Sequence, residues 1–315
     1  MEIPKKIRII GLSSIFIFLA LVSLANVNEH AALEKISLCN QMQGDLVRNT
    51  FDSGLKSLQA KAFYVYDFTK GEALRASNER TPLPLASLTK LMTARLVLQE
   101  KSLTDLYTVK AADLTADGST GFADGESFQI GDILRAALAA SSNDAATILE
   151  RSAGLSDSDF VQAMNSEALK LGLPNLSFGN PTGLDSKDNI ATAFGSAHDV
   201  LMLLYRDYTD FKGVMSISVL PESTIASTDG KKIKLKNTNL VIDKLPLLLA
   251  SKTGYTDIAG GNLAILWQES GSDVVGAAVL GSTTNGRFTD MVSIHDASDN
   301  YIAGQKLLPS SCKQK

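Results

Sequence analysis

The pattern of apolar and polar residues predicts β-strands in two places that lie far apart in the chain. Residues 62–67 are rich in aromatic and β-branched side chains, a turn follows at 69–71, and residues 72–76 complete a hairpin. Much later, residues 231–236 alternate lysine with isoleucine or leucine. Apolar runs between glycine-rich turns then follow at residues 247–253, 262–268 and 274–281. These runs predict a second group of strands.

Between the two groups of strands, apolar residues recur at intervals of three and four, which is the spacing of an amphipathic helix. This spacing occurs at residues 87–101, 131–139, 144–153, 158–171 and 196–205, and it returns at 288–307. Strands, then helices, then strands predict an α+β protein. We expect one antiparallel sheet built from both ends of the chain and flanked by helices. An all-helical lobe is inserted, and a cleft lies between the two parts.

The start of the chain predicts export. Lys5, Lys6 and Arg8 precede an apolar run at residues 9–24, and small residues precede Asn26, as in a signal peptide. The run is shorter than the roughly 20 residues of a spanning helix, yet an uncleaved membrane anchor stays open as an alternative. Either interpretation places the rest of the chain in the periplasm or outside the cell.

Three segments therefore organise the chain. Residues 1–25 are a signal peptide or an N-terminal membrane anchor, 26–58 form a polar and weakly helical lead-in, and 59–315 form the catalytic domain. A length of 315 residues with 44% hydrophobic residues suits one such globular domain. The net charge of −4 predicts no nucleic-acid partner, because nucleic-acid binding usually needs a clustered basic face.

The cysteines and histidines predict no metal site and no cofactor. Cys39 and Cys312 are the only cysteines, and no CxxC pair occurs. His30, His198 and His295 are scattered along the chain. In an oxidising compartment the two cysteines form one disulfide, and the alternative is two unpaired thiols.

The first candidate motif is Ser87-Leu-Thr-Lys90, where a loop containing Pro82 and Pro84 leads into a predicted helix. Residues three apart on a helix share one face, so the Lys90 amine is expected beside the Ser87 hydroxyl. A serine needs a base to become a nucleophile, and a neutral lysine can be that base. The simpler interpretation is an ordinary helix cap.

Two further motifs follow. Ser141-Ser-Asn143 lies between two predicted helices, where a hydroxyl can pass a proton and an amide can bind a substrate backbone. Lys252-Thr-Gly254 ends a predicted strand, and the glycine lets a peptide approach the strand edge while Lys252 and Thr253 face a carboxylate. Each motif alone fits helix or strand punctuation, but their order and context together match the serine enzymes that react with penicillin.

The chain resembles the D-alanyl-D-alanine carboxypeptidase family, the low-molecular-mass penicillin-binding proteins, over residues 62–307. Pro84-Leu-Ala-Ser-Leu-Thr-Lys-Leu-Met-Thr-Ala94 is similar to the nucleophile segment of that family, and Ser141-Ser-Asn-Asp-Ala145 to its second motif. Lys252-Thr-Gly-Tyr-Thr-Asp-Ile-Ala-Gly-Gly-Asn-Leu263 is similar to the third motif and its extension, and Gly183-Leu-Asp185 to a further signature. The resemblance implies the β-lactamase and penicillin-binding transpeptidase-like fold.

The resemblance also implies roles for the motif residues. Ser87 becomes the acylated nucleophile, Lys90 its general base, Ser141 and Asn143 the proton path and substrate clamp, and Lys252 a cation that keeps Lys90 neutral. The implied substrates are peptidoglycan stem peptides, and β-lactam antibiotics are implied covalent inhibitors.

Further residues bind the substrate according to the same resemblance. The backbone N–H groups of Ser87 and Tyr255 form the oxyanion hole, and Thr253 and Gly254 line the substrate strand. Arg287 grips the terminal carboxylate with its guanidinium fork. A solvent-facing charge at a helix start is the alternative for Arg287.

The chain departs from its relatives in two ways. Tyr255 stands where some relatives have histidine, and only residues 309–315 follow the last predicted helix. We therefore expect neither the C-terminal β domain nor the amphipathic membrane helix of the family, so that any membrane association comes from residues 9–24.

The expected activity is serine D-Ala-D-Ala carboxypeptidase, and three alternatives stay open. A DD-endopeptidase would cut peptidoglycan cross-links with the same residues. A class A β-lactamase would need a glutamate that activates the deacylating water, but no glutamate occurs between Leu171 and Asp188. An inactive wall-binding module would not need the intact motifs.

Overall fold

The structure is a computed structural model that describes residues 34, 41–114, 120–269 and 273–307. The chain divides into two compact units, of which residues 54–296 form one. Residues 1–53 and 297–315 belong to the other. The predicted leader, Cys39 and Cys312 lie outside the described residues.

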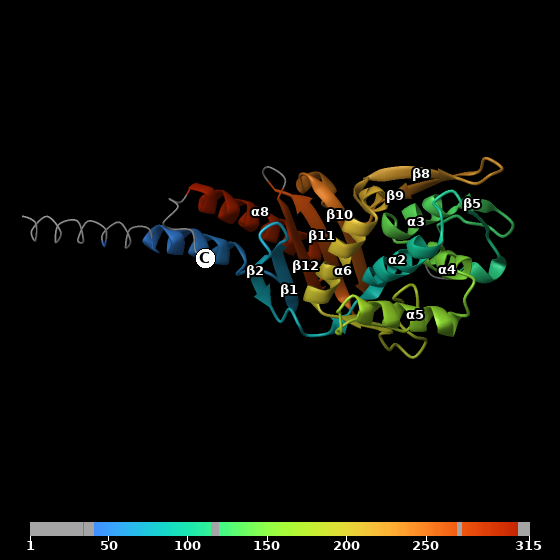
Figure 1. Cartoon of the computed structure of the whole chain (residues 1–315), viewed down its shortest axis with the longest axis horizontal. Coiled ribbons are helices and arrows are strands. Elements are labelled where there is room, and N and C mark those ends of the chain that lie inside the picture. Colours follow the sequence, from blue (N-terminus) through green and yellow to red (C-terminus); the bar gives the residue numbers. More distant parts are fainter. Residues whose placement is uncertain (1–33, 35–40, 115–119, 270–272, 308–315) are drawn as a thin grey trace, which may run out of the picture. The chain divides into compact units, whose positions relative to one another are not determined.

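A five-stranded antiparallel sheet forms the centre of the larger unit (Figure 1). Its spatial order is β10 (Leu248–Thr256), β11 (Gly260–Gln268), β12 (Val274–Ser282), β1 (Ala62–Asp67) and β2 (Glu72–Ser77). Strand β1 pairs with β12 from Ala62 opposite Leu280 to Asp67 opposite Val275. The sheet therefore joins strands from both ends of the chain, as predicted, and leaves β10 at one edge.

The segment between β2 and β10 is mainly helical. Its α-helices are α2 (Lys90–Glu100), α3 (Ile130–Leu138), α4 (Asn143–Ser152), α5 (Asp157–Lys170), α6 (Ala197–Asp210) and α7 (Lys212–Met215). Single 3-10 turns are η1 (Ala86–Thr89), η2 (Ala111–Asp113), η3 (Ser216–Val219) and η4 (Ile242–Lys244).

The expected helical lobe is present, and three small sheets also occur in this segment, one of which contains the strand predicted at residues 231–236. They pair β3 (Leu83–Pro84) and β6 (Ser177–Phe178) with β7 (Ala193–Gly195), β4 (Leu106–Thr108) with β5 (Ser127–Gln129), and β8 (Glu222–Ala226) with β9 (Lys232–Lys236). Most of these strands have two or three residues, which is too short to produce a visible alternation of apolar and polar positions.

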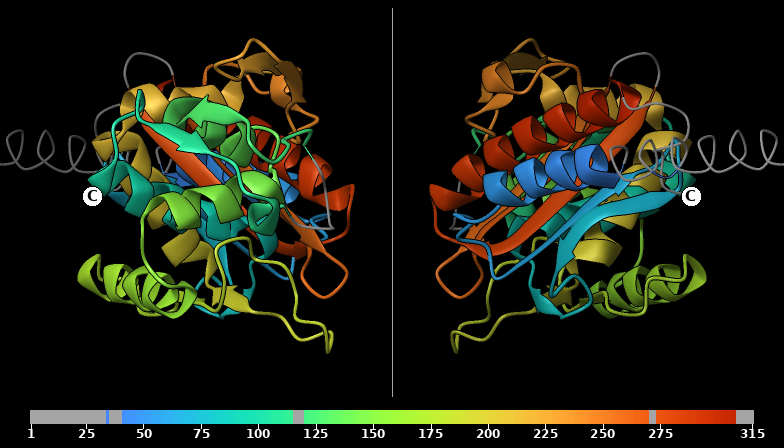
Figure 2. Two further views of the ribbon diagram at one scale, coloured as in Figure 1. Left: turned by 90° about the vertical axis from the view of Figure 1, so that its right-hand side faces the viewer. Right: turned by 90° about the vertical axis from the view of Figure 1, so that its left-hand side faces the viewer.

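Helices cover both faces of the central sheet. Helix α6 packs against β1, β11 and β12, and Figure 2 shows it on the face opposite α8 (Gly286–Leu307). On the α8 side of the sheet, the centroid of the buried Trp267 ring lies 5.1 Å from the centroid of the His295 ring. The apolar residues on both strand faces are thus removed from water, which accounts for the nearly continuous apolar runs of β11 and β12.

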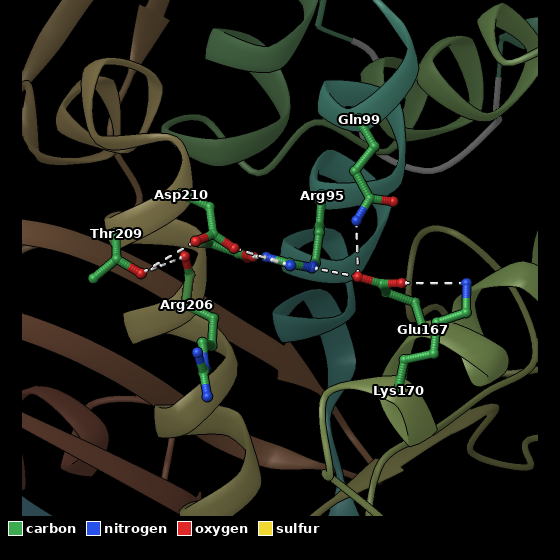
Figure 3. A network of polar contacts seen from close by, with 8 residues as sticks. Arg95, Gln99, Glu167, Lys170, Arg206, Thr209 and Asp210 are labelled. Atoms are coloured by element: carbon green, nitrogen blue, oxygen red, sulfur yellow. Dashed lines mark hydrogen bonds and ion pairs between the residues drawn. The ribbon is translucent and has the colours of Figure 1, made fainter.

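A group of charges that is buried except for Asp210 holds α2 against α5 and α6 (Figure 3). The Arg95 guanidinium on α2 lies 2.9 Å from Glu167 on α5 and 3.1 Å and 3.0 Å from Asp207 and Asp210 on α6. Gln99 also donates to Glu167. One cation thus faces three carboxylates, and burial raises the pKa of Asp207 to about 8. The group fixes the helix that carries Lys90.

The smaller unit contains a helix at residues 41–54, within the predicted lead-in, beside the end of α8 (Figure 2). The rings of Phe51 and Tyr301 stack there with centroids 4.9 Å apart. Among the described residues, no helix has both the length and the apolar character that crossing a membrane requires.

Candidate active site

Ser87 and Lys90 meet where a 3-10 turn leads into α2. The Lys90 amine lies 2.7 Å from the Ser87 hydroxyl, so the two side chains share one side, as their spacing predicted. Ser87 itself lies in η1, and α2 begins only at Lys90, one turn later than predicted. Ala86, the first residue of η1, has a positive φ of 49°, so the chain turns sharply directly before Ser87.

Lys90 is completely buried and has three hydrogen-bond acceptors. In addition to Ser87, its amine donates to Asn143 Oδ1 at 2.8 Å and to the Thr182 carbonyl at 2.9 Å. Asn143 is the first residue of α4, and Thr182 lies in the turn that follows β6. Helix α2, the second motif and a later turn therefore converge on one nitrogen atom.

The turn at Thr182 is built around Asn180. The Asn180 carboxamide oxygen accepts the backbone N–H groups of Thr182 and Gly183, at 3.1 Å and 2.7 Å. A Cβ atom at Gly183 would lie 1.9 Å from the Ala86 carbonyl oxygen, and its φ is +78°. Only glycine fits at this position, which explains the glycine of the Gly183-Leu-Asp185 segment.

Lys252 joins the second and third motifs. Its amine donates to the Ser141 hydroxyl at 2.8 Å and to the Thr253 carbonyl at 2.9 Å. Ser141 has a φ of +58°, which places its side chain at a bend between α3 and α4. Ser141 thus contacts Lys252 directly, and the hydrogen bonds of Lys90 go to other residues.

The two buried lysines repel each other, and both have lowered pKa values. Burial lowers the pKa of Lys90 to about 7. Burial also lowers the pKa of Lys252, and the charges of Lys90 and Arg287 lower it further. Removal from water disfavours an ammonium ion, so burial is the main cause at both residues. The resemblance implied that Lys252 keeps Lys90 neutral, and burial is the cause that the structure gives for the lowered pKa of Lys90.

Strand β10 passes very close to the turn η1, which contains Ser87. A Cβ atom at Gly254 would lie 2.7 Å from the Leu85 carbonyl oxygen and 3.3 Å from the Ser87 nitrogen. Gly254 therefore allows the contact between the third motif and the first, whereas the sequence suggested that it admits substrate. β10 is also an edge strand of the central sheet, and its Ser251 N–H donates to Ser218 Oγ at 3.0 Å.

Asn262 fastens this contact and had no role in the sequence analysis beyond its place in the third motif extension. It is fully buried, and its amide donates to the carbonyl oxygens of Pro84 and Leu85, both at 3.0 Å. Its own oxygen accepts from the Gly281 nitrogen at 2.8 Å. Asn262 thus joins β11, β12 and the loop before Ser87.

Arg287 and Tyr255 lie beside the third motif. Arg287 Nη1 donates to the Gly254 carbonyl at 2.7 Å, and the guanidinium carbon lies 5.7 Å from the centre of the Tyr255 ring. The buried Arg287 Nε has no partner among the described residues. The Tyr255 side chain is exposed, and its hydroxyl donates to Asp257. Arg287 is therefore held beside Gly254, and its Nε–H group has no acceptor among the described residues.

In this site the Lys90 amine contacts both Ser87 and Asn143, and the Lys252 amine contacts Ser141. The described residues hold no cluster of three or more His, Cys, Asp or Glu side chains that would suit a metal ion. Sequence reasoning missed Thr182, because a carbonyl acceptor belongs to no particular residue type. A buried amine near pKa 7 beside a hydroxyl is chemically suited to activate that hydroxyl as a nucleophile.

The chain is similar to known proteins in sequence and in structure. A family model described as D-alanyl-D-alanine carboxypeptidase matches residues 49–284. The carboxypeptidase DacF of Bacillus subtilis is 31% identical over 63% of this chain and 51% of its own length. A D-alanyl-D-alanine endopeptidase of Haemophilus influenzae is 30% identical over 66% of this chain and 70% of its own length.

Among solved structures, penicillin-binding protein D2 of Listeria monocytogenes in the ampicillin-bound form has a TM-score of 0.66 and 30% identity. The match covers 77% of this chain and 98% of that one. The match to DacF spans only about half of that relative. The family model covers most of the chain, and the fold agrees with it, so this chain belongs to the D-alanyl-D-alanine carboxypeptidase family.

Proposed function

We propose that this protein is a serine D-Ala-D-Ala carboxypeptidase that acts on peptidoglycan stem peptides through an acyl-enzyme on Ser87. The observation that carries the proposal is the buried Lys90 amine, 2.7 Å from the Ser87 hydroxyl and with a pKa of about 7. Near neutral pH a large share of this amine is neutral and can accept the hydroxyl proton.

In the acylation step, Ser87 Oγ bonds to the carbonyl carbon of the penultimate D-alanine, and its proton passes to Lys90. The backbone N–H groups of Ser87 and Tyr255 are the proposed donors to the oxyanion. The C–N bond then breaks, and the proton held by Lys90 passes through Ser141 to the leaving D-alanine nitrogen, so that Lys90 is neutral again. Lys252 contacts Ser141 at 2.8 Å and would hold it in place for this transfer. The products of this step are free D-alanine and an ester on Ser87.

Water then hydrolyses the ester. Lys90 takes a proton from the water, the hydroxide bonds to the ester carbon, and the proton returns to Ser87 Oγ as the C–O bond breaks. Asn143 supports this cycle, because its bond to Lys90 at 2.8 Å fixes the amine against the hydroxyl. The amide hydrogens of the same side chain are proposed to bind the substrate backbone.

Substrate binding is proposed to use the edge of β10. An extended peptide would add as a strand beside Thr253, and the terminal carboxylate would face Thr253, Lys252 and Arg287. The unpartnered Nε of Arg287 supports this role, because a buried donor gains a partner when a carboxylate binds. β-Lactams carry a similar carboxylate and are proposed covalent inhibitors, which the ampicillin-bound Listeria relative supports.

A DD-endopeptidase is the second candidate function. Two relatives that are 30% and 32% identical carry the name D-alanyl-D-alanine endopeptidase. The bond cleaved would be a peptide cross-link, with the same chemistry at Ser87.

For both candidate functions we propose that the protein is exported to the periplasm or the cell exterior. Residues 9–24 would then be part of a cleaved signal peptide or a membrane anchor.

The test compares three substrates with the purified full-length protein. D-Alanine release from diacetyl-Lys-D-Ala-D-Ala supports the carboxypeptidase, and cleavage of a cross-linked muropeptide dimer without D-alanine release supports the endopeptidase. Rapid nitrocefin hydrolysis with neither reaction would indicate a β-lactamase instead. Mass spectrometry after penicillin treatment should place the adduct on Ser87, and Ser87→Ala should lose it. Ser223→Ala in β8 is the matched control and should keep it.

A further inference from the structure

Thr238, two residues beyond the end of β9, contacts two of the three motifs. Its Oγ1 lies 2.5 Å from Oγ1 of Thr253, in the third motif. Its backbone N–H donates to the Ala139 carbonyl at 3.1 Å, two residues before Ser141. One threonine outside every motif therefore connects the bend that carries Ser141 to the strand that carries Lys252.

The two asparagines beside Thr238 hold it in place. Asn237 is buried and donates to the carbonyl oxygens of Ser218 and Leu220, at 2.8 Å and 2.9 Å. Asn239 is also buried, and its amide donates to Ser251 on β10 at 3.0 Å. The Asn239 N–H in turn donates to the Asn237 side chain. Thr238 is thus attached to a rigid frame, and its hydroxyl has a fixed position.

The hydroxyl pair has a limited number of protons. Each hydroxyl donates one hydrogen bond and accepts up to two. In the proposed function, Thr253 must donate its proton to the substrate carboxylate, so the bond with Thr238 survives only if Thr238 is the donor. The other acceptor for Thr238 is the Ala139 carbonyl at 3.4 Å, a much longer contact. Donation from Thr238 to Thr253 is therefore the stronger arrangement when a carboxylate is bound.

We propose that Thr238 is a positioning residue that directs the Thr253 hydroxyl proton toward the carboxylate of the substrate or inhibitor. This inference rests on the proposed function, because it assumes that Thr253 meets a carboxylate. Thr238 would not touch the ligand. It would act by occupying the lone pair of Thr253 that faces away from the ligand, so that the remaining O–H points to the strand edge.

The test uses Thr238→Val, which keeps the shape and removes the hydroxyl, and Thr238→Ser, which keeps the hydroxyl. The first substrate is diacetyl-Lys-D-Ala-D-Ala. The second is a diacetyl-Lys-D-Ala ethyl ester, whose leaving group carries no carboxylate. For Thr238→Val we expect KM for the peptide to rise about fivefold, as for the loss of roughly one hydrogen bond, with kcat changed less than about twofold. The ester should react as with the wild type, and Thr238→Ser should restore the peptide KM.

Acylation by benzylpenicillin, which has a carboxylate, separates this inference from the proposed function. A wild-type protein that is acylated but releases no D-alanine would contradict the carboxypeptidase. The Thr238 inference would then be judged by penicillin, with about a fivefold slower acylation expected for Thr238→Val. An unchanged rate with penicillin and an unchanged peptide KM would overturn the inference. Equal losses with the ester and the peptide would also overturn it, because they would indicate a purely structural role.

Discussion

In the proposed function, Lys90 determines how acylation depends on pH. A lysine must be neutral to take the Ser87 proton, and burial lowers the pKa of Lys90 to about 7. The neutral fraction is then about 9% at pH 6, about 50% at pH 7 and about 91% at pH 8. The second-order rate of acylation by a fluorescent penicillin should therefore rise about tenfold between pH 6 and pH 8 and level off above.

Two buried carboxyl groups titrate in the same pH range as Lys90, and their effect on acylation must be distinguished from that of Lys90. Burial raises the pKa of Glu150 to about 7 and that of Asp207 to about 8. We suggest measuring the double variant Glu150→Gln/Asp207→Asn beside the wild type. Because neither carboxyl group contacts Ser87, the rise with pH should persist in the double variant, and circular dichroism should confirm a constant fold over the range.

An acylation rate that is constant between pH 6 and pH 8, or that falls as the pH rises, would refute the role of Lys90 as the base. Loss of the rise in the double variant would assign it to the carboxyl groups and would contradict the role of Lys90. Lys90→Arg supplies the complementary measurement. Its guanidinium stays charged, so acylation should fall by at least about 100-fold at every pH.

Three further predictions concern the frame of the site. Asp207→Asn should reduce the pH dependence of the free energy of unfolding. A carboxyl group whose pKa is raised in the folded state stabilises that state fully when the pH is below its ordinary pKa of roughly 4. That contribution is lost as the pH rises through about 8, so urea unfolding should show wild-type stability falling from pH 5 to pH 9 and the variant changing less. Asn262→Ala should lower the free energy of unfolding by about 3 kcal/mol, because the carbonyl groups of Pro84 and Leu85 and the N–H of Gly281 each lose a partner. Urea unfolding that stays within about 1 kcal/mol of the wild type would contradict this. Gly183→Ala should slow penicillin acylation by at least about tenfold, since its Cβ collides with Ala86 and a shift of reacting groups is costly, whereas Gly172→Ala, with a similar φ of +73° and open space, should acylate normally.

The sequence by itself determined the strands of the central sheet, the longer helices and the three motifs. The periodicity of β1, β11 and β12 predicted strands whose bounds lie within two residues of those observed. These signals are local, because strand pleat and helix turn impose a fixed spacing on the residues that face the core. The contact between Ser87 and Lys90 was predictable for the same reason, since the two residues lie one helical turn apart.

Only the tertiary structure decided how the site works chemically. The pKa of Lys90 depends on burial by segments far along the chain, and one of its acceptors is the Thr182 carbonyl, 92 residues away. Every residue type has a main-chain carbonyl, so the sequence carries no sign of this bond. The attachment of Asn262 to Pro84 and Leu85 and the contact of Thr238 with Thr253 likewise join segments that are adjacent only in the folded chain. Local spacing fixes which side chains share an element, whereas packing between distant segments sets the distances and the burial on which proton transfer depends.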